Sequence, residues 1–252
     1  MSVPSKTLAL GSMLIASLWL SPAVALDAQQ KKEMGEFIRE YLVENPEVML
    51  EVQAALEAKQ QAARVSMAGQ AVAANHDAIF SSKTDVVLGN PDGDVTIVEF
   101  FDYNCGYCKQ ALGDMEEILA SDPNVRFVLK ELPILGPESI AAHRVANAVR
   151  LIAPERYPEF HRMMLGATGM ATEDSAIEIA TSLGISDADI RKSMEEQPND
   201  ALVREAYQLA TNIGVTGTPT YVVGNEALFG AVGRAAIEEK VANVRACGQS
   251  TC

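Results

Sequence analysis

Three stretches of the chain differ in how hydrophobic and polar residues follow one another. Residues 27–80 are rich in Ala, Gln, Glu, Lys, Met and Leu, and the stretch EFIREYLV (residues 36–43) places four apolar side chains on one helical face. Asn45 followed by Pro46 is typical of an N-cap with proline at the first helical position. The pattern therefore predicts an arm of two helices over residues 27–80.

The second helix of this arm carries an apolar stripe at heptad spacing, formed by Met49, Val52 and Leu56 and ending at Lys59. A two-helix arm cannot bury such a stripe alone, so it must pack against the rest of the chain or against a second copy. Because a complete-looking domain follows the arm, we favour a homo-oligomer that forms through residues 27–80. The alternative is a mobile helical linker.

After Phe80 the pattern changes to short β-type runs. VTIVEFF (residues 95–101) is almost continuously β-branched or aromatic, which is typical of a strand buried on both faces. TDVVLG (residues 84–89) indicates a short strand before it. A helical pattern over residues 109–120 and another strand pattern over residues 124–135 follow. The order predicts a right-handed βαβ unit.

A long helical block separates this unit from the next strand signals. Residues 137–214 contain segments that each open with Pro, Ser, Thr, Asn or Asp, the usual helix starts. Two short strand patterns (residues 218–224 and 227–232) and a final helical pattern (residues 234–246) come after it. Because the β pattern resumes only after the helices, we predict one α/β domain over residues 81–252 with a helical insertion at about 137–214.

The first 25 residues have the composition of a secretory signal peptide. Lys6 is the only charged residue, a 13-residue apolar run (Leu8–Leu20) follows, and alanines occupy positions 23 and 25. We expect cleavage after about Ala25 and a periplasmic or secreted mature protein. The alternative is an uncleaved membrane anchor, which the run disfavours because it is shorter than the roughly 20 residues that span a bilayer.

Charge argues against one class of partner. The chain has 20 Lys and Arg against 34 Asp and Glu, a net charge of −14. Such a surface repels phosphates, so we expect no nucleic acid partner.

Exported proteins can keep disulfides, and the spacing of the four cysteines favours two pairs, Cys105 with Cys108 and Cys247 with Cys252. Cys105 lies at the predicted strand-to-helix junction, where free N–H groups and the helix dipole stabilise a thiolate. We therefore predict that Cys105 is an exposed attacking sulfur of low pKa. Cys108, one turn further, is expected deeper, with Gly106 relaxing the backbone between them.

Other interpretations of both pairs stay open. A zinc site at Cys105 and Cys108 needs four ligands, but the other cysteines are distant in sequence and the three histidines occur singly, so we expect no metal there. An inert structural disulfide is the second alternative. For Cys247 and Cys252 we favour a small surface disulfide over a relay pair or a copper(I) site.

Residues 87–246 resemble the DsbA-type thiol:disulfide oxidoreductases of the bacterial periplasm. The resemblance rests on three motifs: VEFFDYNCGYCK, FVLKELPILGPES and GVTGTPTYVVG. It implies an α/β thioredoxin fold with an inserted helical domain, preceded here by the α-helical arm. It also implies that Thr218 and Pro219 lie beside the redox-active Cys105–Cys108 disulfide. Pro219 precedes a strand pattern, where a cis bond or an ordinary loop proline both occur.

Glu99 matches a partly buried acid that the family carries six residues before the first cysteine. The resemblance implies a proton acceptor for Cys108, and Lys130 is a candidate partner for this carboxylate. The alternative is a paired strand glutamate without a role in catalysis.

The dipeptide Gly106-Tyr107 resembles that of dimeric periplasmic disulfide isomerases, and a helical arm before such a domain resembles the ScsC-type proteins. These likenesses imply disulfide interchange as an isomerase or reductase, with exported client proteins that contain cysteines, a membrane thiol redox partner and no cofactor. The alternatives are a DsbA-like dithiol oxidase, a copper-handling periplasmic binding protein, and an interaction module with a structural CxxC.

Overall fold

The computed structural model describes residues 26–252, so the predicted signal peptide lies outside the described residues. The chain divides into two compact units, with the boundary between Leu56 and Glu57. None of the helices in residues 26–252 combines the length and the apolar character needed to cross a membrane.

The described part of the first unit is helical. Helix α1 (Ala28–Glu44) begins at a capping box, in which Asp27 Oδ1 accepts the Gln30 N–H (2.8 Å) and Gln30 Oε1 accepts the Asp27 N–H (3.1 Å). Helix α2 (Glu47–Ala74) begins after Asn45 and Pro46. Large apolar side chains of this unit are exposed: Met34, Phe37, Ile38, Tyr41, Val43, Met49, Leu50, Val52 and Leu56.

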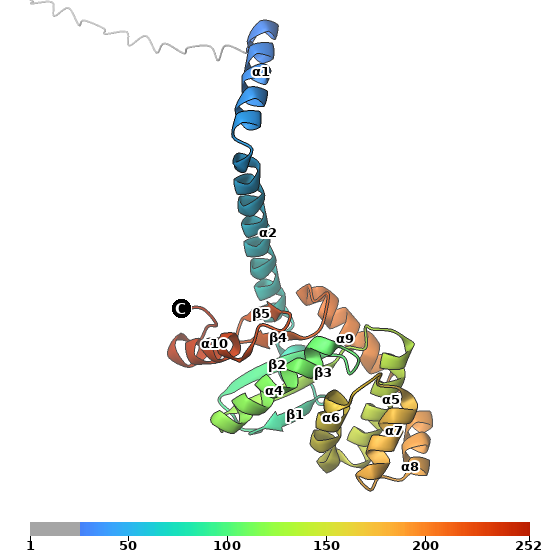
Figure 1. Cartoon of the computed structure of the whole chain (residues 1–252). Coiled ribbons are helices and arrows are strands. Elements are labelled where there is room, and N and C mark those ends of the chain that lie inside the picture. The colour runs from blue at the N-terminus through green and yellow to red at the C-terminus, as the bar shows by residue number, and fades with distance from the viewer. Residues whose placement is uncertain (1–25) are drawn as a thin grey trace, which may run out of the picture. The chain divides into compact units, whose positions relative to one another are not determined.

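The second unit is built on a five-stranded sheet (Figure 1). Its strands are β1 (Val86–Gly89), β2 (Val95–Phe101), β3 (Val125–Glu131), β4 (Thr220–Val223) and β5 (Glu226–Phe229), in the order β1-β3-β2-β4-β5. Strands β2 and β3 are parallel and every other pair is antiparallel. Helix α4 (Gly106–Ser121) connects β2 to β3, which is the predicted βαβ unit.

One face of the sheet packs against α4 and α10 (Arg234–Cys247), and the same hydrophobic core continues into a helical group. That group contains α5 (Pro137–Ile152), a 3₁₀ turn (Pro154–Arg156), α6 (Tyr157–Gly166), α7 (Glu173–Ser182) and α8 (Asp187–Glu196). Figure 1 shows α5 to α8 gathered as a bundle at one side of the sheet.

The opposite face is covered by the end of α2, by α3 (His76–Phe80) and by α9 (Asp200–Ile213). Ala68 and Val72 of α2 are buried there, and the Arg64 guanidinium lies 3.7 Å from the centroid of the Phe229 ring. Residues 57–80 therefore belong to the domain core, and the division falls at residue 56 rather than at residue 80. Helix α9 also lies on the sheet, so the inserted group proper is α5 to α8.

Strand alternation decides which side chains face α4. Ile97 and Phe101 of β2 pack in the core on the α4 side, whereas Val98 and Phe100 pack on the α9 side. Glu99 falls between Ile97 and Phe101 in this alternation and so faces α4. The central strand therefore places one carboxyl group beneath the helix that carries the two cysteines.

Candidate active site

The cysteine pair lies at the start of α4, directly after the loop that leaves β2. Cys105 is the N-cap of α4, its N–H donates to the Asp102 carbonyl (3.0 Å), and its own carbonyl accepts the Lys109 N–H (3.0 Å). Both cysteines are free thiols, and Cys108 is fully buried. We expected Cys105 to be exposed, but only 6% of its surface is accessible, because the Thr218–Pro219 loop packs over it.

The two thiols differ in acidity. The Cys108 thiol is the main cause that lowers the pKa of Cys105 to about 5, and Thr218 and the amides of Tyr107 and Cys108 assist it. Hydrogen bonding to Cys105 and burial raise the pKa of Cys108 far above the usual range of a thiol. At neutral pH the pair therefore holds one thiolate, on Cys105, and one proton, on Cys108.

Gly106 and Tyr107 separate the two cysteines. Gly106 does not adopt a positive φ, and a Cβ at this position would meet no atom within 4 Å. In the reduced pair, therefore, neither the backbone conformation nor the space at this position requires a glycine. Tyr107 is 65% exposed beside the pair.

The loop before β4 faces the cysteines. The Thr218–Pro219 peptide bond is cis, and Cys105 Sγ lies 3.0 Å from the carbonyl oxygen of Thr218. The Thr218 hydroxyl is buried and makes no hydrogen bond of standard geometry to a described residue, but the Thr218 side chain helps to lower the pKa of Cys105. The Pro219 carbonyl accepts the Gly230 N–H (3.0 Å), which ties this loop to the end of β5.

Glu99 is buried beneath the pair, opposite Tyr221 of β4 in the antiparallel register, and the Tyr221 side chain partly offsets the rise in the Glu99 pKa. Burial raises the pKa of Glu99 to about 8, so the carboxyl group is mostly protonated at neutral pH. Lys130 is not its partner. The Lys130 ammonium pairs with Asp85 and donates to the Ala78 carbonyl (2.5 Å) on the other face of the sheet.

A polar network that sequence reasoning missed holds the cysteine loop against the helical group. Asp102 Oδ1 accepts the Asn104 N–H (2.8 Å) and the Ser139 hydroxyl (2.7 Å), and Oδ2 accepts the Leu135 N–H (3.0 Å). The side-chain amide of Asn104 donates to the Ala171 carbonyl (2.9 Å) and accepts the Ala171 N–H at its Oδ1 (2.7 Å). Two of the family motifs contain Asp102, Asn104 and Ser139, but no local pattern shows that these side chains bond to one another, because the partners lie far apart in the sequence.

A second buried cluster forms around Tyr103, two residues before Cys105. His143 and His161, which occur singly in the sequence, both pack against Tyr103 with tilted rings. The Tyr103 hydroxyl lies 3.3 Å from both His161 Nδ1 and the Tyr157 hydroxyl. Burial lowers the pKa of His161 to about 3, so this histidine is neutral. The cluster packs the loop onto the helical group.

An apolar rim, defined here as Tyr107, Leu135 and Met170, borders the cysteine loop. All three side chains are more than half exposed. Leu135 is tied to Asp102 through its N–H, and the loop that carries Met170 is held by Lys109 Nζ, which donates to the Ala167 and Gly169 carbonyls at 2.9 and 2.8 Å. The rim offers an apolar surface beside a reactive sulfur.

The other two cysteines form a disulfide at the end of α10, with a sequence separation of 5. Ser250, between them, is buried: its hydroxyl bonds to the Val223 carbonyl, and its N–H donates to Asn225 Oδ1 (3.0 Å). A Cβ at Gly224, where φ is +58°, would meet Ser250 Oγ at 2.8 Å. Within residues 26–252, no group of three or more His, Cys, Asp or Glu side chains is arranged to hold a metal.

A dithiol at the start of the helix after a central strand, opposed by a cis-proline loop, defines a thioredoxin-fold dithiol protein. Residues 96–242 match the DSBA-like thioredoxin domain, and residues 30–63 match the N-terminal domain of the copper resistance protein ScsC. The chain therefore belongs to the DSBA-like thioredoxin family of thiol–disulfide exchange proteins. The predicted fold class and family resemblance are confirmed.

Solved structures agree with this assignment. A thioredoxin-like oxidoreductase of Silicibacter pomeroyi is 38% identical and covers 69% of this chain and 99% of its own, with a TM-score of 0.65. The thiol-disulfide exchange protein alpha-DsbA2 of Wolbachia pipientis is 27% identical over 72% of this chain and 98% of its own, with a TM-score of 0.67. A variant of Proteus mirabilis ScsC is 27% identical. The match covers 89% of this chain and 99% of the ScsC chain, with a TM-score of 0.63.

The chain also matches part of two much longer curated proteins. It is 27% identical over 139 residues to the Na(+)/H(+) antiporter NhaA 1 of Salinispora arenicola and 25% identical to NhaA 3 of Salinispora tropica. The match covers 55% of this chain and 21% of each antiporter, so the chain spans about a fifth of the length of these relatives.

Proposed function

We propose that this protein catalyses thiol–disulfide exchange in exported proteins through Cys105 and Cys108, as an isomerase or reductase rather than a dedicated oxidase. The observation that carries the proposal is the division of roles within the pair. Cys105 is ionised at neutral pH, whereas Cys108 keeps its proton. A pair in this state is ready to attack a disulfide.

In the first step the Cys105 thiolate attacks one sulfur of a client disulfide. A Cys105–client disulfide forms, the client S–S bond breaks, and the other client sulfur leaves as a thiolate. The Thr218 carbonyl, 3.0 Å from Cys105 Sγ, belongs to a backbone segment that can pair with an extended client chain beside the sulfur. The apolar rim adjoins this segment and supports binding of an unfolded client.

Two outcomes follow from the mixed disulfide. In isomerisation a second client thiolate attacks the client sulfur, which forms a new client disulfide and returns the Cys105 thiolate without net electron transfer. In reduction Cys108 loses its proton and attacks Cys105 Sγ, which releases a client thiolate and leaves a Cys105–Cys108 disulfide. The two electrons given to the client are then restored by a membrane thiol redox partner.

Glu99 is proposed to exchange this proton with Cys108. Its carboxyl group is buried opposite Tyr221 on the α4 side of β2. With a pKa of about 8 it is mostly protonated at neutral pH, so its minor ionised fraction takes the proton that Cys108 loses, and its protonated form gives one back. When a client thiolate opens the Cys105–Cys108 disulfide, the protonated Glu99 can supply the proton that Cys108 needs.

Isomerase or reductase action is preferred over oxidation for two reasons. Gly106-Tyr107 resembles the dipeptide of disulfide isomerases, and residues 30–63 match the N-terminal domain of ScsC. We propose that the exposed apolar side chains of α1 and early α2 pair with a second copy. An oligomer would present several thiolates to one misfolded client and raise their effective concentration.

The test compares two reactions in one glutathione buffer: recovery of scrambled ribonuclease and oxidation of a reduced dithiol peptide. We expect the protein to accelerate ribonuclease recovery more than peptide oxidation. Cys105→Ser should abolish both effects, whereas Cys108→Ser should keep part of the isomerase effect, because isomerisation needs only one attacking thiolate. Faster peptide oxidation without ribonuclease recovery would favour a dedicated oxidase.

A copper-handling role is the second candidate, because the matching N-terminal domain belongs to a copper resistance protein. Copper(I) prefers soft thiolate ligands, and the Cys105–Cys108 pair offers two. Titration of the reduced protein with copper(I), beside Cys108→Ser, tests this role. Tight stoichiometric binding that Cys108→Ser abolishes supports it.

The place of action is proposed to be the periplasm. One similar structure, 32% identical, is a periplasmic thioredoxin-like protein of Salmonella enterica serovar Typhimurium. A signal peptide over residues 1–25 would deliver the chain there. Fractionation of cells that express the full chain, with sizing of the mature N-terminus, tests this location.

A further inference from the structure

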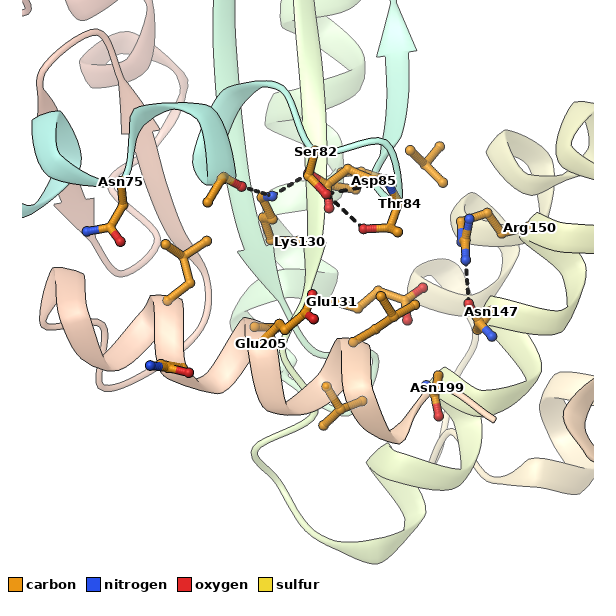
Figure 2. Close-up of a pocket in the computed structure, with 18 of the residues that line it drawn as sticks. Asn75, Ser82, Thr84, Asp85, Lys130, Glu131, Asn147, Arg150, Asn199 and Glu205 are labelled. Carbon is orange, nitrogen blue, oxygen red and sulfur yellow. Dashed lines mark hydrogen bonds and ion pairs between the residues drawn. The ribbon is translucent and has the colours of Figure 1, made fainter. Parts of the chain in front are cut away.

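The second unit contains a cavity of about 370 Å³ on the face of the sheet that α9 covers. It is lined by the segment around α3, by β1 and β3, by α5 and by α9 (Figure 2), and it opens to the surface, since lining residues such as Glu205 are exposed. Neither Cys105 nor Cys108 lines it, although Leu129 and Tyr157, which belong to the same hydrophobic core as the cysteines, do. Its volume lies within the range of cavities that hold small organic ligands.

One pair of charges in the wall neutralises itself. The Lys130 ammonium pairs with Asp85 and donates to the Ala78 carbonyl at 2.5 Å. Both side chains are nearly buried, so this pair forms part of a preformed wall and offers little net charge to a ligand.

An unpartnered acceptor lies in the opposite wall. Asn199 is 3% exposed and lines the cavity, its Nδ2 donates to the His143 carbonyl (3.3 Å), and its Oδ1 has no hydrogen-bond partner. A buried acceptor that stays unpaired is unfavourable. Because this oxygen has almost no accessible surface, it faces the packed wall and does not contribute to binding a ligand in the cavity.

Two acidic groups and one guanidinium complete the lining. Figure 2 shows Glu131 and Glu205 entering the same space from β3 and α9, with Arg150 on the α5 side. Glu131 accepts the Tyr157 hydroxyl (2.6 Å) and lies 3.2 Å from His143 Nδ1. Among the described residues, Glu205 has no ion pair, and Arg150 bonds only to Asn147 Oδ1 (2.7 Å).

From this arrangement we infer that the cavity binds a small zwitterion with a free ammonium group and a carboxylate, of the amino acid or dipeptide class. The acids at Glu131 and Glu205 complement an ammonium group, which only donates hydrogen bonds. Arg150 complements a carboxylate, which a guanidinium binds in a bidentate manner. The site is separate from the dithiol and goes beyond the exchange reaction.

The test is calorimetric titration of the full reduced protein with the proteinogenic amino acids and dialanine, each tested singly at millimolar concentration. At least one should bind with one-to-one stoichiometry. Its Nα-acetyl derivative, which lacks the ammonium group, and its carboxamide, which lacks the carboxylate, should each bind roughly tenfold more weakly, the loss expected for one charge-assisted contact.

Variants locate the binding. Glu205→Gln and Arg150→Gln should each weaken binding by about tenfold. Glu178→Gln, an exposed glutamate on α7 outside the cavity, should leave binding unchanged. Disulfide exchange by Glu205→Gln should persist, which shows that the variant is folded and separates this test from the exchange activity. No binding by any probe, equal binding of the carboxamide, or binding that Glu205→Gln does not weaken would overturn the inference.

Discussion

Cys105 Sγ lies 3.0 Å from the carbonyl oxygen of Thr218, although the two residues are 113 positions apart in the sequence. A carbonyl oxygen accepts hydrogen bonds, so it cannot stabilise a thiolate and even favours the protonated thiol. The low pKa of Cys105 must come from donors: first the Cys108 thiol, then the Thr218 side chain and the amides at the start of α4. The loop therefore positions the sulfur, and the helix start ionises it.

The first prediction concerns this ionisation. In the reduced protein the thiolate absorbance and the rate of alkylation of Cys105 should rise with a midpoint near pH 5. A midpoint near 9.0, the ordinary value of this thiol, would contradict the proposed exchange reaction. Cys108→Ser is the informative control: it replaces the main donor, so it should shift the midpoint while keeping the attacking sulfur.

The same pKa predicts how the stability of the reduced protein depends on pH. The folded pKa of about 5 lies below the unfolded value of 9.0, so ionisation of Cys105 stabilises the fold. This contribution is complete above pH 9 and is lost progressively as the pH falls towards 5. The stability difference between the reduced protein and Cys105→Ser should therefore shrink over this interval in urea unfolding.

Glu99 should give the opposite pH dependence of stability. Its folded pKa of about 8 exceeds the ordinary value of 4.5, so the wild-type protein should lose stability as the pH rises from 4.5 to 8. The loss is at most about 1.4 kcal/mol per pH unit. Glu99→Gln keeps a hydrogen-bonding partner for Tyr221 without a titrating group, so it should not show this loss. Equal pH profiles for the two proteins would mean that Glu99 is ionised throughout.

The sequence identified the cysteine pair, the opposing proline and most helices and strands, because caps, apolar runs and the CxxC spacing are local signals. Contacts between side chains on different strands were harder to predict from the sequence. Glu99 was expected to meet Lys130, but the parallel register sets Glu99 beside Leu129, and Lys130, one residue further, points to the opposite face. The carboxamide of Asn104 finds Ala171 only because α5 and α6 fold back, which no local pattern specifies.

That contact gives another prediction. Asn104→Ala removes bonds to Ser139 Oγ (3.1 Å) and to the Ala171 carbonyl and N–H, and it should lower the free energy of unfolding by about 2–3 kcal/mol. Asn124→Ala, at an exposed asparagine whose amide makes no such contacts, should change it by less than about 0.5 kcal/mol in the same urea titration. Similar effects of the two substitutions would mean that the network does not stabilise the loop.

The Cys247–Cys252 disulfide is expected to stabilise the tail without taking part in exchange. Replacing both cysteines by serine should cost about 2 kcal/mol, the value for so short a closed loop. Ribonuclease recovery should stay at the wild-type rate, because the Cys105–Cys108 pair is unchanged. A several-fold loss of rate at unchanged folding would instead assign this pair to an electron relay.

The last prediction concerns self-association through the first unit. Val52 and Leu56 are 56% and 53% exposed in the single chain, and their heptad spacing suits pairing between copies. The double substitution Val52→Glu and Leu56→Glu should convert an oligomer into a monomer in light scattering, because two carboxylates per chain would be desolvated at the interface. Gln60→Glu, a charge added at an exposed position of the same helix, should leave the mass unchanged.

If the oligomer is what favours isomerisation, the monomeric variant should lose ribonuclease recovery. The pKa of its Cys105 should stay near 5, since the dithiol lies wholly within the second unit. A monomeric wild-type protein with full isomerase activity would break this link between the arm and the reaction.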